Sequence, residues 1–372
     1  MGSRVEEYDW KVGRVRAYAA DRGLDAVVLT RRCNFAWLTV GGLNHIGTGG
    51  EVGATSLVVM QDRVVCVTNK IEAPRVAAEE LAGFDIEMWP YDWFDGVSAG
   101  RVWSDVLAGL WSACDVDVAG LPTTVTGLGS DFGVLRYTLT GWEIDRLRVL
   151  ARATAETLES ACRRVRSGMT EHELAGSIGG ELLRQGIRVP TLLVAGDERV
   201  ERYRHPIPTE KRFERYGMAV VGGERDGLIV SCSRLFSFGA VGKELTRKHE
   251  AVCRVDAAMM AATRPGRTMG DVFAVAEKAY GDEGYAGEIE LHHQGGLAGY
   301  VAREVKATAG NTFGIGLNQM YAWNPSITGT KSEDSILVGE EGNEILTATG
   351  GWPTLRCEAG GRTWLRPAIL VL

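Results

Sequence analysis

Four residues near the middle of the chain, Thr140-Gly141-Trp142-Glu143, constrain the fold more than any other short segment. A Thr followed three residues later by a Glu is a capping box, in which each side chain bonds the other residue's backbone amide at the start of a helix. The pattern that follows predicts a helix of about 24 residues that ends at Ser167-Gly168. We take this helix as the start of a second domain and expect domains at residues 1–138 and 139–372. A chain of 372 residues is long enough for each domain to bury its own core.

The part before the capping box alternates helical and extended patterns. Helical periodicity is present at residues 8–22 and 73–83. Short apolar runs predict strands at residues 25–30, 34–42, 55–60, 62–69 and 116–120. This order of elements is typical of an α/β domain.

The part after the capping box has a different order of elements. A second capping box, from Thr170 to Glu173, predicts a helix that ends near Gly186. The remaining patterns predict strands over 189–239, helices around 246–263 and 270–280, and strands again from about 289 to 346. Helices that are grouped in the sequence beside antiparallel strands indicate an α+β domain.

Composition excludes several classes of protein. The 41 basic and 48 acidic residues give a net charge of −7, which argues against binding to nucleic acid or to an anionic membrane. The seven cysteines are scattered and form no Cys-x-x-Cys pair, so neither a disulfide framework nor a cysteine zinc site is expected. The N-terminal residues have no apolar run typical of a signal peptide, and no window approaches the roughly 20 apolar residues of a membrane span. We therefore expect a reduced, cytoplasmic protein.

Four segments of the second part carry a resemblance to a known family. They are residues 142–158, 166–178, 263–285 and 332–347. In this order they resemble the opening helix, the turn and helix after it, a later helix and the closing strand of the pita-bread family. That family includes creatinase, prolidase, aminopeptidase P and methionine aminopeptidase. The resemblance implies an α+β pita-bread domain at 139–372, preceded by a smaller α/β creatinase-type domain at 1–138.

The peptidases of this family bind two divalent ions with two Asp, one His and two Glu. Matching Ser233-Arg234 to the family's Thr-Arg places the second Asp position on Ser231. Residues 224–239 have the outline of a β-hairpin with Gly227 at its turn, and counting back along this hairpin places the first Asp position on Val220. Valine cannot bind a metal, and a serine hydroxyl is a poor replacement for a carboxylate.

The other three ligand positions are only partly kept. The His position falls on His292, with His293 as the alternative, because His292 and Gly295 fit the family's His-Gly-x-Gly pattern. The first Glu position falls on Asn324 and the second on Glu333. One His and one Glu are too few for a pair of metal ions, so we expect no metal and no other cofactor.

The residues that remain indicate a different chemistry. The family's substrate-side histidine matches His205, so that His205, His292 and Glu333 are the predicted catalytic residues. This set resembles creatinase, which hydrolyses a C–N bond without a metal by acid–base catalysis. Histidine suits proton transfer because its ordinary pKa lies close to neutral pH. A surface histidine, and a Glu that only pairs with a neighbouring cation, are the structural alternatives.

Further residues are predicted to contact the substrate. Arg303 lies at a spacing from His292 that in creatinase belongs to an arginine holding the substrate carboxylate, a task that suits the guanidinium group. The alternative for Arg303 is a surface ion pair with Glu304. The other predicted substrate contacts are Ser231, Asn324, Tyr300 and His45.

The glycine-rich segment 40–53, which contains Asn44 and His45, has no phosphate-binding pattern. In creatinase the corresponding region reaches the active site of the partner subunit. The resemblance therefore implies a homodimer in which the N-terminal domain, through residues such as Asn44 and His45, contributes to the partner's active site.

Cys232 follows Ser231 and could suggest a nucleophile. In a strand, alternate side chains point to opposite faces, so Ser231 and Ser233 share one face and Cys232 takes the other. This pattern favours a core position for Cys232.

The sequence therefore predicts a metal-independent, creatinase-like enzyme. We expect it to hydrolyse, or to cleave as a lyase, a C–N bond of a small substrate that carries a carboxylate. One alternative is an inactive pita-bread protein that binds a peptide or a protein in the former active-site cleft. Another is a metal-dependent Xaa-Pro peptidase, which the missing carboxylates disfavour.

Overall fold

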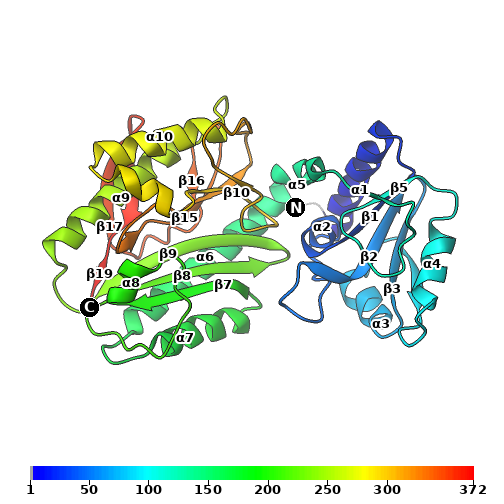
Figure 1. The fold of residues 1–372 in the computed structure, drawn as a ribbon, viewed down its shortest axis with the longest axis horizontal. Coiled ribbons are helices and arrows are strands. Elements are labelled where there is room, and N and C mark those ends of the chain that lie inside the picture. Colours follow the sequence, from blue (N-terminus) through cyan, green and yellow to red (C-terminus); the bar gives the residue numbers. More distant parts are fainter. Residues whose placement is uncertain (1–2) are drawn as a thin grey trace. The chain divides into compact units, whose positions relative to one another are not determined.

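Residues 3–372 are described by a computed structural model, in which the chain divides into two units between Arg136 and Tyr137 (Figure 1). The first unit is built around a mixed sheet with strand order β4-β3-β2-β1-β5-β6. Its strands are β1 (Ala26–Arg31), β2 (Val52–Met60), β3 (Val64–Asn69), β4 (Glu87–Tyr91), β5 (Ser112–Cys114) and β6 (Thr126–Gly127). Its helices are α1 (Arg4–Asp21), α2 (Arg32–Leu38), α3 (Ala73–Arg75), which continues as a π-helical turn at Val76–Glu80, and α4 (Ser98–Val106). A 3₁₀ turn at Ser130–Gly133 and the short helix α5 (Val134–Tyr137) follow.

Two of the strands predicted for this unit are wrong. The segment predicted as a strand at 34–42 belongs mostly to the helix α2, whose residues Asn34 to Leu38 are all buried. A short segment that is buried all round has no polar face, so hydrophobic periodicity cannot distinguish a helix from a strand there. The strand predicted at 116–120 lies earlier, as β5. The chain turns after Asp115, whose carboxylate accepts hydrogen bonds from the backbone amides of Thr30 and Arg31 at 2.9 and 3.0 Å.

The second unit contains two main sheets with helices packed against them. One sheet has the order β19-β9-β8-β7 and the other the order β11-β10-β12-β15-β16. The strands are β7 (Arg188–Gly196), β8 (Tyr216–Arg225), β9 (Leu228–Ser237), β10 (Gly295–Ala298), β11 (Val305–Lys306), β12 (Met320–Trp323), β13 (Ser326–Ile327), β14 (Thr330–Lys331), β15 (Asp334–Leu337), β16 (Glu344–Ile345), β17 (Thr354–Ala359), β18 (Arg362–Pro367) and β19 (Leu370–Val371). The helices are α6 (Gly141–Arg164), α7 (Glu171–Arg184), α8 (Glu198–Arg202), α9 (Lys243–Ala262) and α10 (Met269–Asp282), with a 3₁₀ turn at Ala286–Leu291.

The helices cover the outer faces of these two sheets. Helices α6 and α7 pack on the sheet that contains β7, β8 and β9, whereas α9 and α10 lie on the side of the other sheet (Figure 1). Strands β9 and β15 are in contact, so the inner faces of the two sheets meet. The α+β class predicted for this part of the chain is therefore confirmed.

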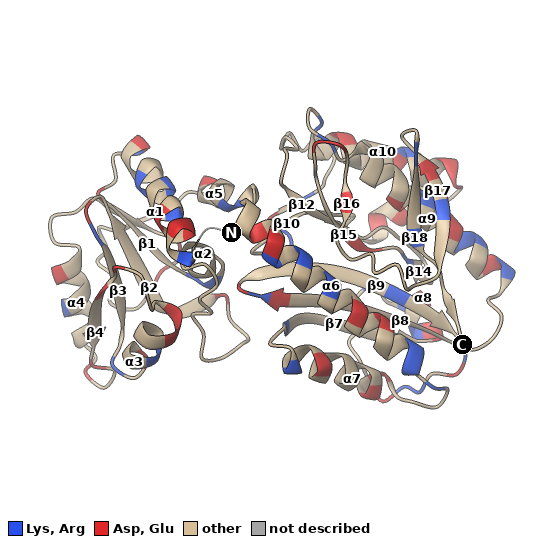
Figure 2. Ribbon diagram, turned by 180° about the vertical axis from the view of Figure 1, so that it is seen from behind, with Lys and Arg blue, Asp and Glu red and all other residues tan. Residues whose placement is uncertain are grey.

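Both predicted capping boxes are present. The Thr140 hydroxyl accepts from the backbone amide of Glu143 at 3.2 Å, and the Glu143 carboxylate accepts from the amide of Thr140 at 2.8 Å. Thr170 and Glu173 form the same pair of bonds at the start of α7. The predicted length of α6 is also confirmed, since the helix has 24 residues. Acidic and basic residues are interspersed along α6 (Figure 2), as expected for a helix with one solvent-exposed side.

Strands β8 and β9 form a hairpin with a two-residue turn. Asp226 and Gly227 have φ angles of +54° and +77°, and positive φ at both central positions is the requirement of a type I′ turn. The turn fixes the register, so that Val220 pairs with Ser233 and Gly222 with Ser231. These paired residues share one face of the sheet.

A buried network of charged side chains connects the two sheets. Arg234 on β9 donates to Glu159 of α6 and to Asp334 of β15, each at 3.0 Å. Arg366 on β18 donates to the other oxygen of Asp334 at 2.8 Å and to Asp256 of α9 at 2.6 Å. Each of these charges therefore has a partner of opposite sign, which a buried charge requires.

A buried histidine on α9 makes the stability of this unit depend on pH. His249 lies between the hydroxyl of Thr330, at 2.7 Å from Nδ1, and the backbone carbonyl of Pro367, at 2.8 Å from Nε2. Burial lowers the pKa of His249 from its ordinary value of 6.5 to about 4. Between these two values the unfolded chain binds more protons than the folded chain, so stability is lost as the pH falls through this window. The loss should reach about 3 kcal/mol.

Urea unfolding at a series of pH values measures this effect. We expect His249→Gln to remove the loss of stability between pH 6.5 and 4 that is due to this group. His172 has an exposed side chain, so His172→Gln is the matched control and should keep the loss. An unchanged pH dependence in His249→Gln would contradict the prediction.

Candidate active site

His205 lies in the loop after α8, and contacts on both of its neighbours hold that loop. Arg204 forms an ion pair with Glu288 of the 3₁₀ turn at Ala286–Leu291. The carbonyl of Pro206 accepts from the backbone amide of Val194 on β7 at 3.2 Å. His205 as a whole residue is exposed, and its ring packs edge-on against that of His292. The chain around this side chain is thus fixed while the residue remains partly accessible.

His292 and His293 follow the 3₁₀ turn and precede β10. The backbone of His292 is extended, with φ −157° and ψ 143°, and its carbonyl accepts from the side chain of Gln294 at 2.5 Å. Gln294 is held in turn by the hydroxyl of Tyr280 at 3.0 Å. The two imidazoles are stacked, with 4.6 Å between ring centroids.

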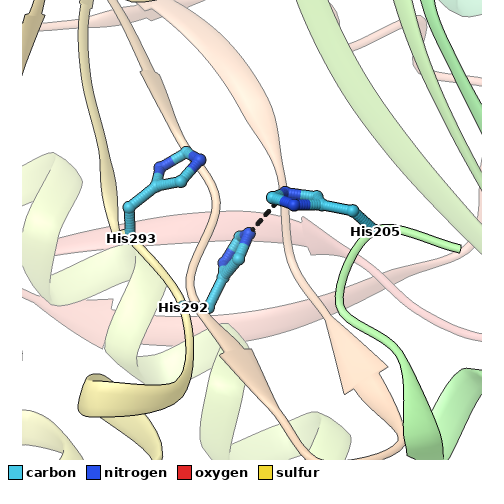
Figure 3. Close-up of side chains that lie close together, drawn as sticks. All are labelled: His205, His292 and His293. Carbon is cyan, nitrogen blue, oxygen red and sulfur yellow. Dashed lines mark hydrogen bonds between the residues drawn. The ribbon is translucent and has the colours of Figure 1, made fainter.

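Among the described residues 3–372, His205, His292 and His293 gather into one cluster (Figure 3). The Nε2 atoms of His205 and His292 are 3.0 Å apart and share a hydrogen bond, and the ring centroids of His205 and His293 are 5.8 Å apart. One nitrogen from each ring lies within 4.8 Å of the other two. Both His292 and His293, the two alternatives for the family's His position, therefore lie against His205.

The surroundings keep these three imidazoles neutral. Burial lowers the pKa of His205 and of His292, and the nearby charge of Lys331 lowers both further. The pKa of His293 falls to about 4 through burial and the nearby charge of Arg303. A neutral imidazole has one nitrogen that accepts a proton and one that donates, which is the state that a general base requires.

Glu333 is the buried carboxylate beside this cluster. One of its oxygens accepts from the hydroxyl of Ser233 at 2.5 Å, and the Nζ atom of Lys331 lies 3.8 Å from the same oxygen. The other oxygen accepts from Arg303 at 3.2 Å. Burial lowers the pKa of both cations, Lys331 and Arg303. The carboxylate therefore lies between two buried cationic side chains.

Lys331 is a site residue that the sequence analysis missed. It precedes Glu333 by two residues, a spacing that places two side chains on the same face of an extended chain. This spacing is the sequence feature that could have assigned Lys331 to the same site as Glu333. The expected alternative for Arg303, a surface ion pair with Glu304, is replaced in the structure by its bond to the buried Glu333.

The positions expected for the family's two metal ions do not fit a dinuclear centre. Val220 is buried and offers no ligand atom, and Ser231, diagonally opposite on the hairpin, offers a hydroxyl. Asn324 is buried with its Oδ1 atom lacking a hydrogen-bond partner within residues 3–372, so it offers a neutral amide oxygen. Glu333 already binds Arg303. Paired divalent ions require several carboxylates, and these positions supply one.

The remaining predicted substrate contacts are placed as follows. The hydroxyl of Tyr300 donates to the carboxylate of Glu143 at 2.7 Å, a contact that ties it to the start of α6. His45 lies in the first unit, between α2 and β2. The side chain of its neighbour Asn44 is fully buried and bonds the backbone of Thr55 in both directions at 2.8 Å, so Asn44 has a structural role. The substrate contacts of Tyr300 and His45 stay predictions.

Cys232 is fully buried, and burial strongly raises the pKa of its thiol. The expectation that it packs in the core is confirmed. A buried thiol with a raised pKa is a poor nucleophile.

Comparison with known proteins identifies the family. The sequence profile of the metallopeptidase family M24 matches residues 145–340, which is more than half of the chain. The chain belongs to the metallopeptidase family M24. The profile of the creatinase/prolidase N-terminal domain matches residues 11–113. The predicted resemblance and fold class are both confirmed.

Individual relatives of this M24 protein are distant. An uncharacterized peptidase of Staphylococcus aureus is 25% identical over 214 residues, a match that covers 55% of this chain and 61% of the relative. A similar protein of Staphylococcus saprophyticus is 24% identical over the same shares. The chain therefore spans less than two thirds of the length of these relatives.

Solved structures show the same fold. The Xaa-Pro dipeptidase of Bacillus anthracis superposes with a TM-score of 0.77 and 17% identity over 98% of this chain and 100% of that one. The prolidase of Pyrococcus horikoshii gives a TM-score of 0.75 and 16% identity over 91% and 98%. The N-terminal domain of the FACT complex subunit SPT16 from chickpea gives 0.71 and 11% over 93% and 97%. At these identities the likeness concerns the fold alone.

Within residues 3–372 every helix is too short or too polar to cross a bilayer.

The charge arrangement around Glu333 predicts a loss of stability in Glu333→Gln. This change leaves Lys331 and Arg303 buried without their carboxylate, and removal of one partner from a buried ion pair costs about 3–5 kcal/mol. Urea unfolding measures the loss. The exposed Glu210 provides the control Glu210→Gln, which should change stability little. Adding Lys331→Met to Glu333→Gln should recover part of the lost stability. If Glu333→Gln is as stable as the unchanged protein, the carboxylate does not compensate the two cations.

Proposed function

We propose that this M24 protein is a hydrolase that cleaves a C–N bond of a small, carboxylate-bearing substrate without the family's pair of metal ions. The observation that carries the proposal is the environment of Glu333. This carboxylate, which falls on a metal-ligand position by resemblance, is bound by Arg303 and lies beside Lys331. Two side-chain cations thus supply positive charge in the region where the peptidases of the family use metal ions.

His205 is the group that moves protons in this proposal. His205 as a residue is accessible to solvent, and its Nε2 atom is 3.0 Å from that of His292. In the neutral state His205 takes a proton from water as the water oxygen forms its bond to the substrate carbon. It then gives this proton to the leaving nitrogen as the C–N bond breaks, which balances the hydrolysis.

His292 and Glu333 have supporting roles in the same reaction. His292 is buried and hydrogen-bonded to His205, so it orients the reacting ring and selects its tautomer. Glu333 accepts from the hydroxyl of Ser233 at 2.5 Å, which fixes the direction of the carboxylate. A fixed carboxylate stabilises positive charge that develops on the leaving nitrogen.

The charges of the site favour an anionic substrate. Arg303 and Lys331 together carry one positive charge more than Glu333 compensates, and both cations are largely buried. A buried cation gains from a carboxylate or another planar anion brought into contact with it. We infer that the substrate carboxylate is directed toward Arg303 and Lys331 while its scissile bond lies at His205.

Peptide cleavage after the manner of the named relatives is a second candidate, which the M24 family membership favours. It requires a divalent ion, and the two candidates therefore differ in their response to a chelator. A homodimer is a further proposal that rests on the resemblance to creatinase, and light scattering on the purified protein tests it.

The experiment is a screen for turnover in the presence and absence of EDTA. The panel contains guanidino acids, N-carbamoyl amino acids, cyclic ureides and Xaa-Pro dipeptides, with products measured by mass spectrometry. We expect hydrolysis of a non-peptide member that persists in EDTA. His205→Ala should lower kcat at least about 100-fold, the usual contribution of a general acid–base group.

The exposed His172 provides the control, since His172→Ala should leave turnover unchanged. Cleavage of Xaa-Pro dipeptides that depends on added divalent ions would contradict the proposal. So would full activity of His205→Ala.

A further inference from the structure

We propose that the cluster of His205, His292 and His293 binds one divalent transition-metal ion of the Zn²⁺ type, and that the bound ion blocks the reaction. The binding itself is independent of the catalytic role assigned above. The inhibition rests on the proposed function, because a metal bound at His205 occupies the nitrogen lone pair that has to accept a proton. By resemblance this site shares His292 with the family's carboxylate centre, and it differs from that centre in its other ligands and in the number of ions.

The spacing of the imidazole nitrogens fits a single small ion. Zinc binds histidine nitrogens at about 2.0–2.1 Å in a tetrahedral arrangement, which places the ligand atoms about 3.4 Å from one another. In the cluster, the Nε2 atoms of His205 and His292 are 3.0 Å apart. One nitrogen from each of the three rings lies within 4.8 Å of the other two. Binding of zinc requires the nitrogen of His293 to lie closer to the other two, and neither His205 nor His293 is fully buried.

Polar atoms without partners provide a second, independent observation. The Nδ1 atoms of both His292 and His293 are buried and have no hydrogen-bond partner within residues 3–372. The side chain of His292 is also more than nine-tenths buried. Polar atoms in such a position usually bind a ligand, a water or another protein group. Because no hydrogen bond holds the Nδ1 atom of His292 or of His293, each ring can turn to present one of its two nitrogens to an ion.

The ligand set determines the class of metal. Imidazole nitrogens suit Zn²⁺, Cu²⁺, Ni²⁺ and Co²⁺, whereas Mg²⁺ and Ca²⁺ require oxygen ligands. Three protein ligands leave one tetrahedral position open, which a water, a hydroxide or the substrate carboxylate can fill.

The charged groups around the cluster make the binding reversible. Lys331 and Arg303 repel a dication, and Glu333 offsets one of these two charges. Arg204 is neutralised by Glu288 through their ion pair. One uncompensated positive charge therefore remains near the ion, which weakens its binding and favours an anion in the open position.

Cobalt provides the direct test, because tetrahedral Co²⁺ has an absorption spectrum that reports its ligands. Untagged protein is stripped with EDTA, dialysed and titrated with CoCl₂, and Zn²⁺ is then added to displace the cobalt. We expect one ion per chain and a tetrahedral spectrum. Loss of a group that only supports a metal ligand already lowers metal affinity by about 10- to 100-fold. Loss of a ligand itself, in His293→Gln or His205→Gln, should therefore weaken binding at least about tenfold.

His172→Gln is the matched control, because His172 is a histidine of the same unit with an exposed side chain, outside the cluster. It should bind the ion like the unchanged protein. If His293→Gln does not fold, His205→Gln still tests the site, since His205 is an exposed residue of a loop. The absence of saturable binding, or equal affinity of both cluster variants and the unchanged protein, would overturn the inference.

The inhibition is measured separately, on whichever substrate the screen identifies. The Zn²⁺ concentration that halves turnover should equal the concentration that half-saturates the binding site. Binding without inhibition would overturn the inhibitory role alone. Two bound ions per chain that depend on Glu333 but not on His293, together with activation, would instead overturn the proposed function. The metal-binding result stands even if no substrate is found.

Discussion

The arrangement of the site depends on the buried contact between Arg234 and Asp334. Arg234 follows Ser233 on β9, and Asp334 follows Glu333 at the start of β15. Their 3.0 Å bond lies on one side of the two strands, and the Ser233–Glu333 bond of 2.5 Å lies on the other. Because alternate side chains point in opposite directions, the structural ion pair aligns the pair that faces the site. A shift by one residue would exchange the two pairs.

Much of the fold could be predicted because its signals are local. The capping residues Thr140 and Glu143 meet each other across one turn of chain, and the Asp226-Gly227 turn fixes its hairpin without distant help. The strand predicted around Phe35 was wrong because this segment is buried on all sides by other parts of its unit. Its conformation is decided by tertiary packing, which periodicity does not contain.

Only those site residues that match a position of the family pattern could be predicted from the sequence. His205 and His292 could be located by resemblance, and the structure brings them to within 3.0 Å of each other. His293 enters the sequence analysis only as the alternative to His292, and Lys331 matches no family position although it lies two residues before Glu333. The place of His293 in the cluster depends on its contact with His205, which is distant in the sequence. The resemblance predicts a substrate carboxylate as the partner of Arg303, with Glu304 as the alternative. No local pattern indicates its bond to Glu333, which is 30 residues away.

The ion pair between Arg204 and Glu288 has a consequence for how this cluster can change over time. Arg204 directly precedes His205, and Glu288 lies in the turn that leads into His292. This ion pair joins the two segments close to both rings, so it fixes the distance between His205 and His292 locally. The long intervening stretch, which includes the hairpin and two helices, can therefore change in length without separating the two histidines. Substitutions in that stretch can alter the surroundings of the cluster while its central pair of side chains stays in place.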